Sequence, residues 1–412
     1  LYAAAATYSI GYLRGERDHP IPFHRYARRF YLGLNLFALA MICAPLVNGL
    51  ALLWVAVEIT TVVSALLVAL DDTDSSSEAA WKYVLIASAG LGIGLLATIF
   101  MYYAGSTVLG QSYDLAFGPL LDAGATLPHT AVQLSFLLAV LGYGTKVGLF
   151  PVHTWLPDAH SEAPTPISAL LSGSLLAVSF YAILRYFQIA VATVGPDFPR
   201  TTLLVFGLLS LLLAALYLVQ QRDIKRLLAY SSVEHMGILA IGVGFGAPLA
   251  LAGVLLHVMA HAAAKGNAFF GAGVLVRKYR TKSIGNIRAS LDTLPWTAPL
   301  FLGAILALSA MPPFGLFRSE FQIVAGGLST ASHIPAVLLV VLVTLAFLGL
   351  SVTTTRMLLA PGASVPARGE PSAWMVAPML AGVVVLVVLG IHPPGDLVDL
   401  LSRGVIELGG GR

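Results

Sequence analysis

The chain has 412 residues, of which 58% are hydrophobic and only 10% are charged, and its formal net charge is +3. Soluble domains carry about 25% charged residues, so this composition excludes a soluble enzyme and predicts an all-α polytopic membrane protein. Cys43 is the single cysteine, which excludes a disulfide, a cysteine-ligated iron–sulfur cluster and a thiolate metal site within this sequence.

Residues 1–12 are expected to form the last turns of a helix, so the N-terminus looks truncated rather than like a signal peptide. A basic loop, 14–29, follows and contains Arg14, Arg17, Arg25, Arg28 and Arg29. About 20 apolar residues cross a bilayer. The rest of the chain predicts eleven such spans, at about 30–46, 49–70, 80–103, 131–161, 165–187, 201–221, 232–246, 248–276, 297–328, 335–357 and 373–391.

The loops between these spans differ in charge and composition. Loop 71–78 is acidic and serine-rich, and Ser77 is expected to cap the helix after it. If loop 14–29 faces the cytoplasm, alternation places the other basic loops on the same side, as the positive-inside rule requires. These loops lie near 222–226, 277–282 and 356–368. The basic residues occupy short loops, so nothing indicates nucleic-acid binding.

The span 131–161 contains Lys146, the only charge of its apolar run. A lysine in hydrocarbon costs ~3 kcal/mol or more, so a charge at this depth marks a functional site by default. Gly148 and Pro151 follow and predict a helix break, because glycine loosens a helix and proline removes a backbone donor. Such breaks occur where they line a cavity or are buried in protein. Lys146 is therefore expected to belong to a proton or cation relay.

The span 297–328 repeats this arrangement. It is interrupted at Pro312–Pro313 and Gly315, and Glu320 lies near the break as Lys146 lies near the first. Four uninterrupted spans separate the two breaks, and the resulting period of five helices inverts the topology. Paired interrupted helices of this kind indicate a transport path. We expect one transmembrane domain, 1–412, with inverted repeats at about 30–188 and 201–357 and a terminal span at 373–391.

His257, His261 and Lys265 are spaced at i, i+4 and i+8 and therefore share one helix face. Imidazole changes its charge near neutral pH, so three titratable groups along one face predict a relay. A structural role remains open for either histidine alone. The same spacing could bind a metal, but neither an HExxH motif nor an acidic residue at ligand spacing accompanies it. We therefore expect neither a metal nor a cofactor.

Other ionisable residues leave alternatives open. Glu320 can serve as a proton exit or pair with Arg318, two residues away. Glu234 and His235 are expected at a helix start, where a cap or loop contact and a relay both remain possible. Three residues at the mouth of the interrupted helix are expected to be solvated loop charges, with proton uptake as the alternative: Asp158, His160 and Glu162.

Four blocks carry a family resemblance: KVGLFPVHTWLPDAHSEAPTPISALLSG, QQRDIKRLLAYSSVEHMG, LLHVMAHAAAKGNAFFGAG and MPPFGLFRSEF. In this order they resemble the proton-pumping, antiporter-like membrane subunits of respiratory complex I. They also resemble the related subunits of membrane-bound nickel–iron hydrogenases and of multisubunit sodium/proton antiporters. The amino-acid sequence around Lys146 and Pro313 is most similar to that of the F-type subunit of hydrogenase-4.

The resemblance implies two inverted five-helix repeats, other membrane subunits and a peripheral redox arm as partners, and a prokaryotic cytoplasmic membrane. It implies a relay through Glu58, Lys146, His257, His261, Lys265 and Glu320. Glu58 would pair with Lys146, and a salt bridge that only locks two helices is the alternative. The span at 165–187, which corresponds to the eighth span of the family, carries no lysine or histidine at residues 170–177, where some relatives do. The link from Lys146 to His257 would then run through water, Ser172 or Ser174.

The resemblance implies three possible functions. The first is proton translocation in a redox-driven complex of the hydrogenase-4 or NADH-quinone oxidoreductase type. The second is a cation/proton antiporter subunit, and the third is an ion-conducting partner in inorganic-carbon uptake. A self-contained redox enzyme is disfavoured by the single cysteine and by the lack of a nucleotide-binding glycine-rich loop. The chain is also expected to stop soon after its last span, without the lateral helix that some relatives carry.

Overall fold

The computed structural model describes residues 1–15, 21–362 and 366–409, and within these ranges it is helical without a strand. Ten of the described segments are long and apolar enough to cross a membrane. These are α2 with η1 (Phe23–Leu46), α3 with η2 (Leu50–Asp71), α4 (Asp74–Leu109), α6 (His129–Val147), α8 to α9 (Thr165–Val194), α10 (Asp197–Leu218), α11 (Ile224–Phe245), α12 (Pro248–Tyr279), α16 (His333–Leu359) and α17 (Ala373–Ile391). The prediction of an all-helical, multi-pass membrane protein is confirmed.

Shorter helices complete the chain. α14 (Thr297–Leu308) and α15 (Gly315–Leu328) together form an eleventh, interrupted segment. α7 (Trp155–Glu162) follows α6 beyond the other interruption. The remaining short helices are α1 (Tyr2–Arg14), α5 (Phe117–Asp122), α13 (Ser290–Thr293) and α18 (Gly395–Leu408).

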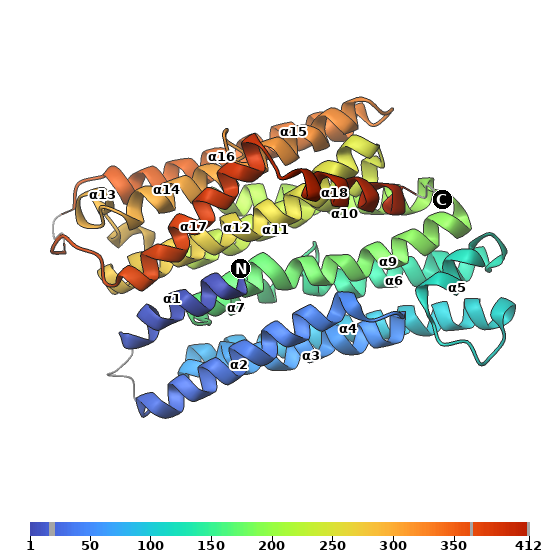
Figure 1. The fold of residues 1–412 in the computed structure, drawn as a ribbon, viewed down its shortest axis with the longest axis horizontal. Helices are drawn as coiled ribbons and strands as arrows, with labels where there is room; N and C mark the ends of the chain where they lie inside the picture. Colours follow the sequence, from blue (N-terminus) through green and yellow to red (C-terminus); the bar gives the residue numbers. More distant parts are fainter. Residues whose placement is uncertain (16–20, 363–365, 410–412) are drawn as a thin grey trace.

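The long helices run side by side in one bundle (Figure 1). In this view α2, α3 and α4 lie along one edge and α14, α15 and α16 along the other, with α11 and α12 between them. α11 is the innermost helix, because every residue from 231 to 245 is buried. A helix that is buried all round lies in the core of a large protein. Any polar side chain on this part of α11 therefore depends on protein partners.

The outside of the bundle is apolar. Leu39, Leu66 and Ile334 are among the large hydrophobic side chains that remain exposed, at 57%, 70% and 76%. Soluble monomers rarely expose contiguous apolar surface on this scale. A lipid environment removes the cost of this exposure, which agrees with the predicted membrane spans.

The basic loop near the N-terminus is shorter than predicted. α2 begins at Phe23 instead of residue 30, so three arginines assigned to the loop lie on its first two turns: Arg25, Arg28 and Arg29. Long arginine side chains can keep the guanidinium in water while their stems cover apolar surface, so a helix can begin before its apolar run. Arg17 lies outside the described residues.

The acidic loop is also shorter than predicted. α4 begins at Asp74, because Thr73 and Ser76 form a reciprocal cap. The Ser76 amide donates to Thr73 Oγ1 (3.1 Å) and the Thr73 amide donates to Ser76 Oγ (3.0 Å). The prediction that Ser77 caps this helix is therefore wrong.

α11 begins at Ile224, two turns before the predicted start at residue 232. Asp223 caps it, since Asp223 Oδ1 accepts from the amides of Lys225 (2.8 Å) and Arg226 (2.9 Å). Charged residues around position 223 are typical of a loop, which explains why the predicted start of α11 is too late. Lys225 is in fact buried, and its ammonium donates to the Ala163 carbonyl (2.8 Å).

Both predicted helix breaks are present. Beyond α6, Gly148 has φ 85°, a left-handed conformation that glycine adopts without strain. The amides of Gly148 and Leu149 donate to the Gly144 carbonyl (2.9 and 2.8 Å), which closes the helix end. Beyond α14, the Met311 amide donates to the Leu306 carbonyl (3.0 Å). The division of the chain into two inverted repeats stays a prediction.

A further helix follows the last span, although the sequence was expected to end soon after it. α18 lies against α12, and Gln188 Nε2 on α9 donates to the carbonyl of Glu407 (3.2 Å). The sequence does not predict α18 as a span, because only one face of this helix is apolar.

α4 and α6 cross with their backbones in contact. A Cβ atom on Gly142 would lie 2.4 Å from the Gly94 amide nitrogen and 2.9 Å from the Gly90 carbonyl oxygen. Small residues permit such close approach between membrane helices. Lys146 lies one turn beyond Gly142 on the same face of α6, so this crossing sets the distance from Lys146 to α4.

The crossing predicts opposite effects for two glycine-to-alanine substitutions. Each replacement favours the helical backbone by about 1 kcal/mol. Gly142→Ala must also push two backbones apart, and overpacking of this kind costs about 1–3 kcal/mol. Gly92 on α4 faces open space, so Gly92→Ala is the matched control. Thermal unfolding in detergent should show a lower midpoint for Gly142→Ala only. Equal midpoints would contradict the close crossing.

Candidate functional site

Lys146 is fully buried at the end of α6, next to the first helix break. Its ammonium donates to Thr61 Oγ1 on α3 (2.8 Å) and to the Tyr83 hydroxyl on α4. The Tyr83 hydroxyl lies 2.7 Å from Ser64 Oγ. The break turns the chain so that α7 places the Trp155 ring 5.9 Å from Lys146 Nζ. Three helices and two aromatic rings therefore enclose this one ammonium group.

Glu58 lies near Lys146 without contacting it. Ser88 Oγ on α4 donates to Glu58 Oε1 (3.1 Å), and Glu58 Oε2 has no hydrogen-bond partner. No ion pair within 4 Å joins Glu58 to Lys146, although the two charges interact at longer range. The geometry therefore does not support a salt bridge that locks two helices. Thr61, one turn after Glu58, takes the place of the carboxylate next to Lys146.

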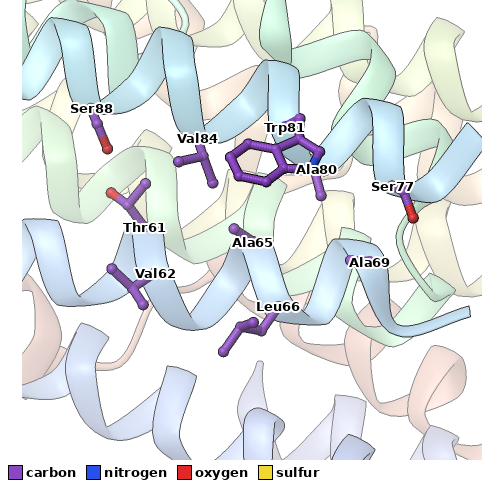
Figure 2. A pocket seen from close by; sticks show the side chains of 10 residues that line it. All are labelled: Thr61, Val62, Ala65, Leu66, Ala69, Ser77, Ala80, Trp81, Val84 and Ser88. Atoms are coloured by element: carbon purple, nitrogen blue, oxygen red, sulfur yellow. The ribbon is translucent and has the colours of Figure 1, made fainter. Parts of the chain in front are cut away.

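A pocket of about 360 Å³ between α3 and α4 reaches this pair (Figure 2). Figure 2 shows Thr61 and Ser88 at the same end of the pocket, one on each helix. Thr61 is the partner of Lys146, and Ser88 is the partner of Glu58. The opposite end is bordered by Ala69 and Ser77, and Leu66 and Trp81, which are 70% and 67% exposed, lie between the two ends. The pocket therefore extends from the hydrogen-bond partners of Lys146 and Glu58 to exposed apolar side chains of α3 and α4.

A second cluster joins three helices in the core. His235 (α11), His257 (α12) and Glu320 (α15) are all buried. His235 Nδ1 lies 3.1 Å from His257 Nε2 and 3.8 Å from Glu320 Oε1. The His261 ring lies 5.0 Å from the His235 ring, measured between centroids. Arg318 forms no ion pair with Glu320 among the described residues, so the alternative role for Glu320 as its partner is not supported.

His235 is the residue whose position the sequence predicted least well, although a relay role for it had been left open. It was expected near a helix start, but α11 begins earlier and places it in the buried core. Glu234 lies beside it and is also buried, with Oε2 unpaired. The signal that could have found both residues was the Asp223 cap, which moves the start of the helix by two turns.

Ser319 fixes the tautomer of His257. Ser319 Oγ donates to the Leu316 carbonyl (2.9 Å), because a carbonyl can only accept. The same oxygen lies 3.0 Å from His257 Nδ1 and must therefore accept its hydrogen. His257 Nε2 is then unprotonated and accepts from His235 Nδ1. We assign the tautomers from this network, and it orients both rings.

Lys265 lies two turns beyond His257 on the same face of α12, as predicted. It is fully buried, and its ammonium donates to the Leu228 carbonyl on α11 (2.9 Å). Glu234 is near enough to interact with its charge. His261 lies between His257 and Lys265, and neither of its ring nitrogens has a partner. The structure therefore places all three predicted residues of α12 in contact with polar groups of α11 or facing them.

His160 occupies the space between the two clusters. It was expected as a solvated loop charge, but it is fully buried and both of its ring nitrogens lack a partner. Its ring lies 6.3 Å from Trp155, which borders Lys146, and it interacts with the charge of Lys265. α7 thus places an ionisable side chain between Trp155 and Phe269 of α12. The helix break is what folds α7 back into the core.

The other two residues of this group behave as surface charges. Asp158 binds Lys82 (3.4 Å) and Arg226 (2.8 Å). Glu162 binds Lys282 (2.9 Å). Burial acts to raise the pKa of Glu162, but the hydrogen bond and charge of Lys282 outweigh it, so this pKa lies below its ordinary value. Both carboxylates therefore hold the loops together at this end of the bundle.

The segment α8 to α9 places a serine against the central helix α11. Residues 171–175 form a π-helical turn, and Ser172 Oγ lies 2.7 Å from Ser232 Oγ on α11. Such turns are frequent at functional sites. Ser172 thus contacts the central helix as one of the predicted links, whereas Ser174 makes no side-chain hydrogen bond within the described part of the chain.

The Ser319 network predicts a measurable loss of stability. Ser319→Ala removes the acceptor of a buried His257 N–H group, and an unsatisfied buried donor costs about 1–3 kcal/mol. Ser402 on α18 is exposed, and its hydroxyl also donates to a helix carbonyl (2.8 Å). Ser402→Ala should stay within about 0.5 kcal/mol. Unfolding midpoints in detergent compare the two, and equal midpoints would exclude the assigned network.

Comparisons with known proteins show which family the chain belongs to. The family model described as NADH:quinone oxidoreductase/Mrp antiporter, TM, matches residues 47–349. The chain is 35% identical over 379 residues to the Hydrogenase-4 component F homolog of Methylacidiphilum infernorum, covering 92% of this chain and 77% of that protein. It is 32% identical to Hydrogenase-4 component B of Escherichia coli, covering 78% of this chain but only 47% of that protein.

A solved structure shares the fold. The membrane-bound sulfane sulfur reductase, an archaeal respiratory membrane complex, contains a chain that matches with a TM-score of 0.85 at 23% identity. The match covers 98% of this chain and 81% of the other. The family model matches most of the chain and the relative from Methylacidiphilum infernorum is 35% identical, so the chain belongs to the NADH:quinone oxidoreductase/Mrp antiporter family of transmembrane proteins.

Proposed function

We propose that this chain moves protons across the membrane along its buried ionisable side chains, as a subunit of a redox-driven complex. The observation that carries the proposal is the series of buried ionisable side chains that lies between one helix break and the other. Ionisable groups are costly inside a protein or a membrane, and a purely structural role would pair them fully. Here several keep unpaired atoms, namely Glu58, His160, Glu234, His235, His261 and Glu320.

The order of the groups suggests a path. A proton on Lys146 passes His160 to reach Lys265 and Glu234, then the histidine cluster, and leaves through Glu320. Imidazole suits the middle of this path because it can accept at one nitrogen and release from the other. The gaps that exceed hydrogen-bond length require bridging water. Glu320 fits the exit because its side chain keeps 10% exposure beside the second break.

Glu58 acts as the switch in this scheme. A carboxylate 4 Å from an ammonium contributes about 4 kcal/mol at an effective dielectric of ~20. When Glu58 approaches Lys146, the ammonium keeps its proton, and when Glu58 withdraws, the proton moves inward. In the withdrawn state of this scheme, Ser88 would bind Glu58 and Thr61 would bind Lys146, and the two hydrogen bonds at 3.1 and 2.8 Å support this assignment.

The driving reaction is assigned to partners. Two relatives are named as hydrogenase components, and the matched structure is a multisubunit respiratory complex. We therefore place this chain among other membrane subunits and a peripheral redox arm in a prokaryotic cytoplasmic membrane. The redox centres would lie on that arm, because a single cysteine cannot ligate a cluster.

A cation/proton antiporter subunit is the second candidate, because the matching family model covers Mrp antiporters as well. Purification from the native membrane separates the two. Co-purifying hydrogenase or iron–sulfur subunits support the first function, and small antiporter subunits support the second. A partner that handles inorganic carbon would support the third possibility.

The first prediction on function concerns the switch. Lys146→Ala and Glu58→Ala should each reduce redox-driven proton uptake into vesicles to the leak rate while the complex still assembles. Lys278→Ala is the control, since this lysine lies outside the path and donates to the Gly369 carbonyl (2.7 Å). Proton uptake is measured with a pH-sensitive dye. Full uptake by vesicles that contain Lys146→Ala would rule the proposal out.

His235, which the structure places in the buried core, provides a second test. His235→Gln keeps a polar side chain of similar size but cannot relay a proton, so uptake should fall by about 10²-fold, the usual minimum for a positioned proton-transfer group. The control is His129→Gln, at an exposed histidine outside the path. Unchanged uptake in His235→Gln would remove the histidine cluster from the route.

A further inference from the structure

The histidine cluster has the composition and spacing of a metal site. One ligand atom each from His235, His257 and Glu320 lies within 4.8 Å of the others. Zinc bonds of about 2.0–2.1 Å in a tetrahedron separate neighbouring ligand atoms by about 3.3–3.4 Å. The measured separations of 3.1 Å (His235 Nδ1 to His257 Nε2) and 3.8 Å (His235 Nδ1 to Glu320 Oε1) lie on either side of this value.

The second-sphere contacts also suit a metal. Ser319 accepts the His257 Nδ1 hydrogen, so the unprotonated Nε2 points at His235 (3.1 Å) and is available as a ligand. Metal-binding histidines commonly hold their other nitrogen in this way. For His235 to bind a metal through Nδ1, its hydrogen must lie on Nε2. Nε2 has no hydrogen-bond partner among the described residues, so nothing there prevents this tautomer. Both imidazoles can therefore present a lone pair to the same point while remaining neutral.

The unsatisfied atoms indicate a ligand. Among the described residues, Glu320 Oε1 has no hydrogen-bond partner although Glu320 is only 7% exposed, and this is the oxygen that lies 3.8 Å from His235 Nδ1. Buried polar atoms are normally satisfied, so unsatisfied ones call for an explanation. The sequence reading excluded a metal because it found no acidic residue at ligand spacing on α12. Glu320 supplies that residue from α15, which only the folded chain brings near.

The structure assigns to His235, His257 and Glu320 a site for a divalent cation of borderline softness, such as Zn²⁺ or Co²⁺. Two imidazole nitrogens and one carboxylate oxygen favour this class over Na⁺, Mg²⁺ or Ca²⁺, which prefer oxygen ligands. Three protein ligands leave the fourth position for water. The cation would occupy three groups of the proposed proton path and compete with protons there.

The experiment measures binding directly, so it does not depend on proton transport. Co²⁺ is added to the purified protein within its native complex, and visible absorption reports tetrahedral coordination. We expect one tetrahedral Co²⁺ per chain, displaced by Zn²⁺. Glu320→Gln and His257→Gln should each weaken binding by 10-fold or more. Ser319→Ala should weaken it by about 10–100-fold, the range for loss of a supporting hydrogen bond.

The controls decide between this site and others. His129→Gln, at an exposed histidine, should leave the Co²⁺ spectrum and affinity unchanged. No tetrahedral spectrum in the wild type would overturn the proposal, and so would a spectrum that persists in Glu320→Gln. If His257→Gln fails to assemble, Glu320→Gln gives the answer alone. Tetrahedral Co²⁺ in the wild type together with full proton uptake by Lys146→Ala would leave this inference standing and overturn the proposed function. Absence of tetrahedral Co²⁺ together with lost uptake in Lys146→Ala would overturn this inference and leave the proposed function standing.

Discussion

Ionisable side chains lose several kcal/mol of hydration when they leave water, and this constraint explains much of the architecture. Lys146 and Lys265 are fully buried, so the fold must give each ammonium oxygen atoms to bind. Lys146 receives hydroxyl groups from two neighbouring helices, and Lys265 receives a main-chain carbonyl from α11. The helix breaks, the glycine crossing of α4 and α6 and the buried position of α11 all bring such partners within reach.

The sequence predicts those features that a run of residues encodes directly. Apolar runs of sufficient length predict the spans, and Gly148 with Pro151 predicts a break, because each acts through the local backbone. The boundary of α11 was wrong because it depends on whether the Asp223 side chain turns back onto two amides. Neither length nor hydropathy contains that information.

The candidate site was predictable only in part for a similar reason. His257, His261 and Lys265 share a helix face by spacing alone, the two helix breaks point to Lys146 and Glu320, and the family resemblance supplied the role of Glu58. His160 and His235 were expected near the membrane surface, because their burial depends on which helices become neighbours. Ser319 was missed because a serine beside a glutamate carries no signal until the ring of His257 is placed above it.

The two hydrogen bonds of Ser319 limit the directions in which a proton can leave His257. The serine hydrogen is given to the Leu316 carbonyl, and a main-chain carbonyl has no proton to hand on. The hydrogen bonds of Ser319 thus fix the orientation of the His257 ring but offer no onward route for a proton. Under the proposed function, a proton on His257 would therefore pass on through His235, which faces Glu320, and not through Ser319.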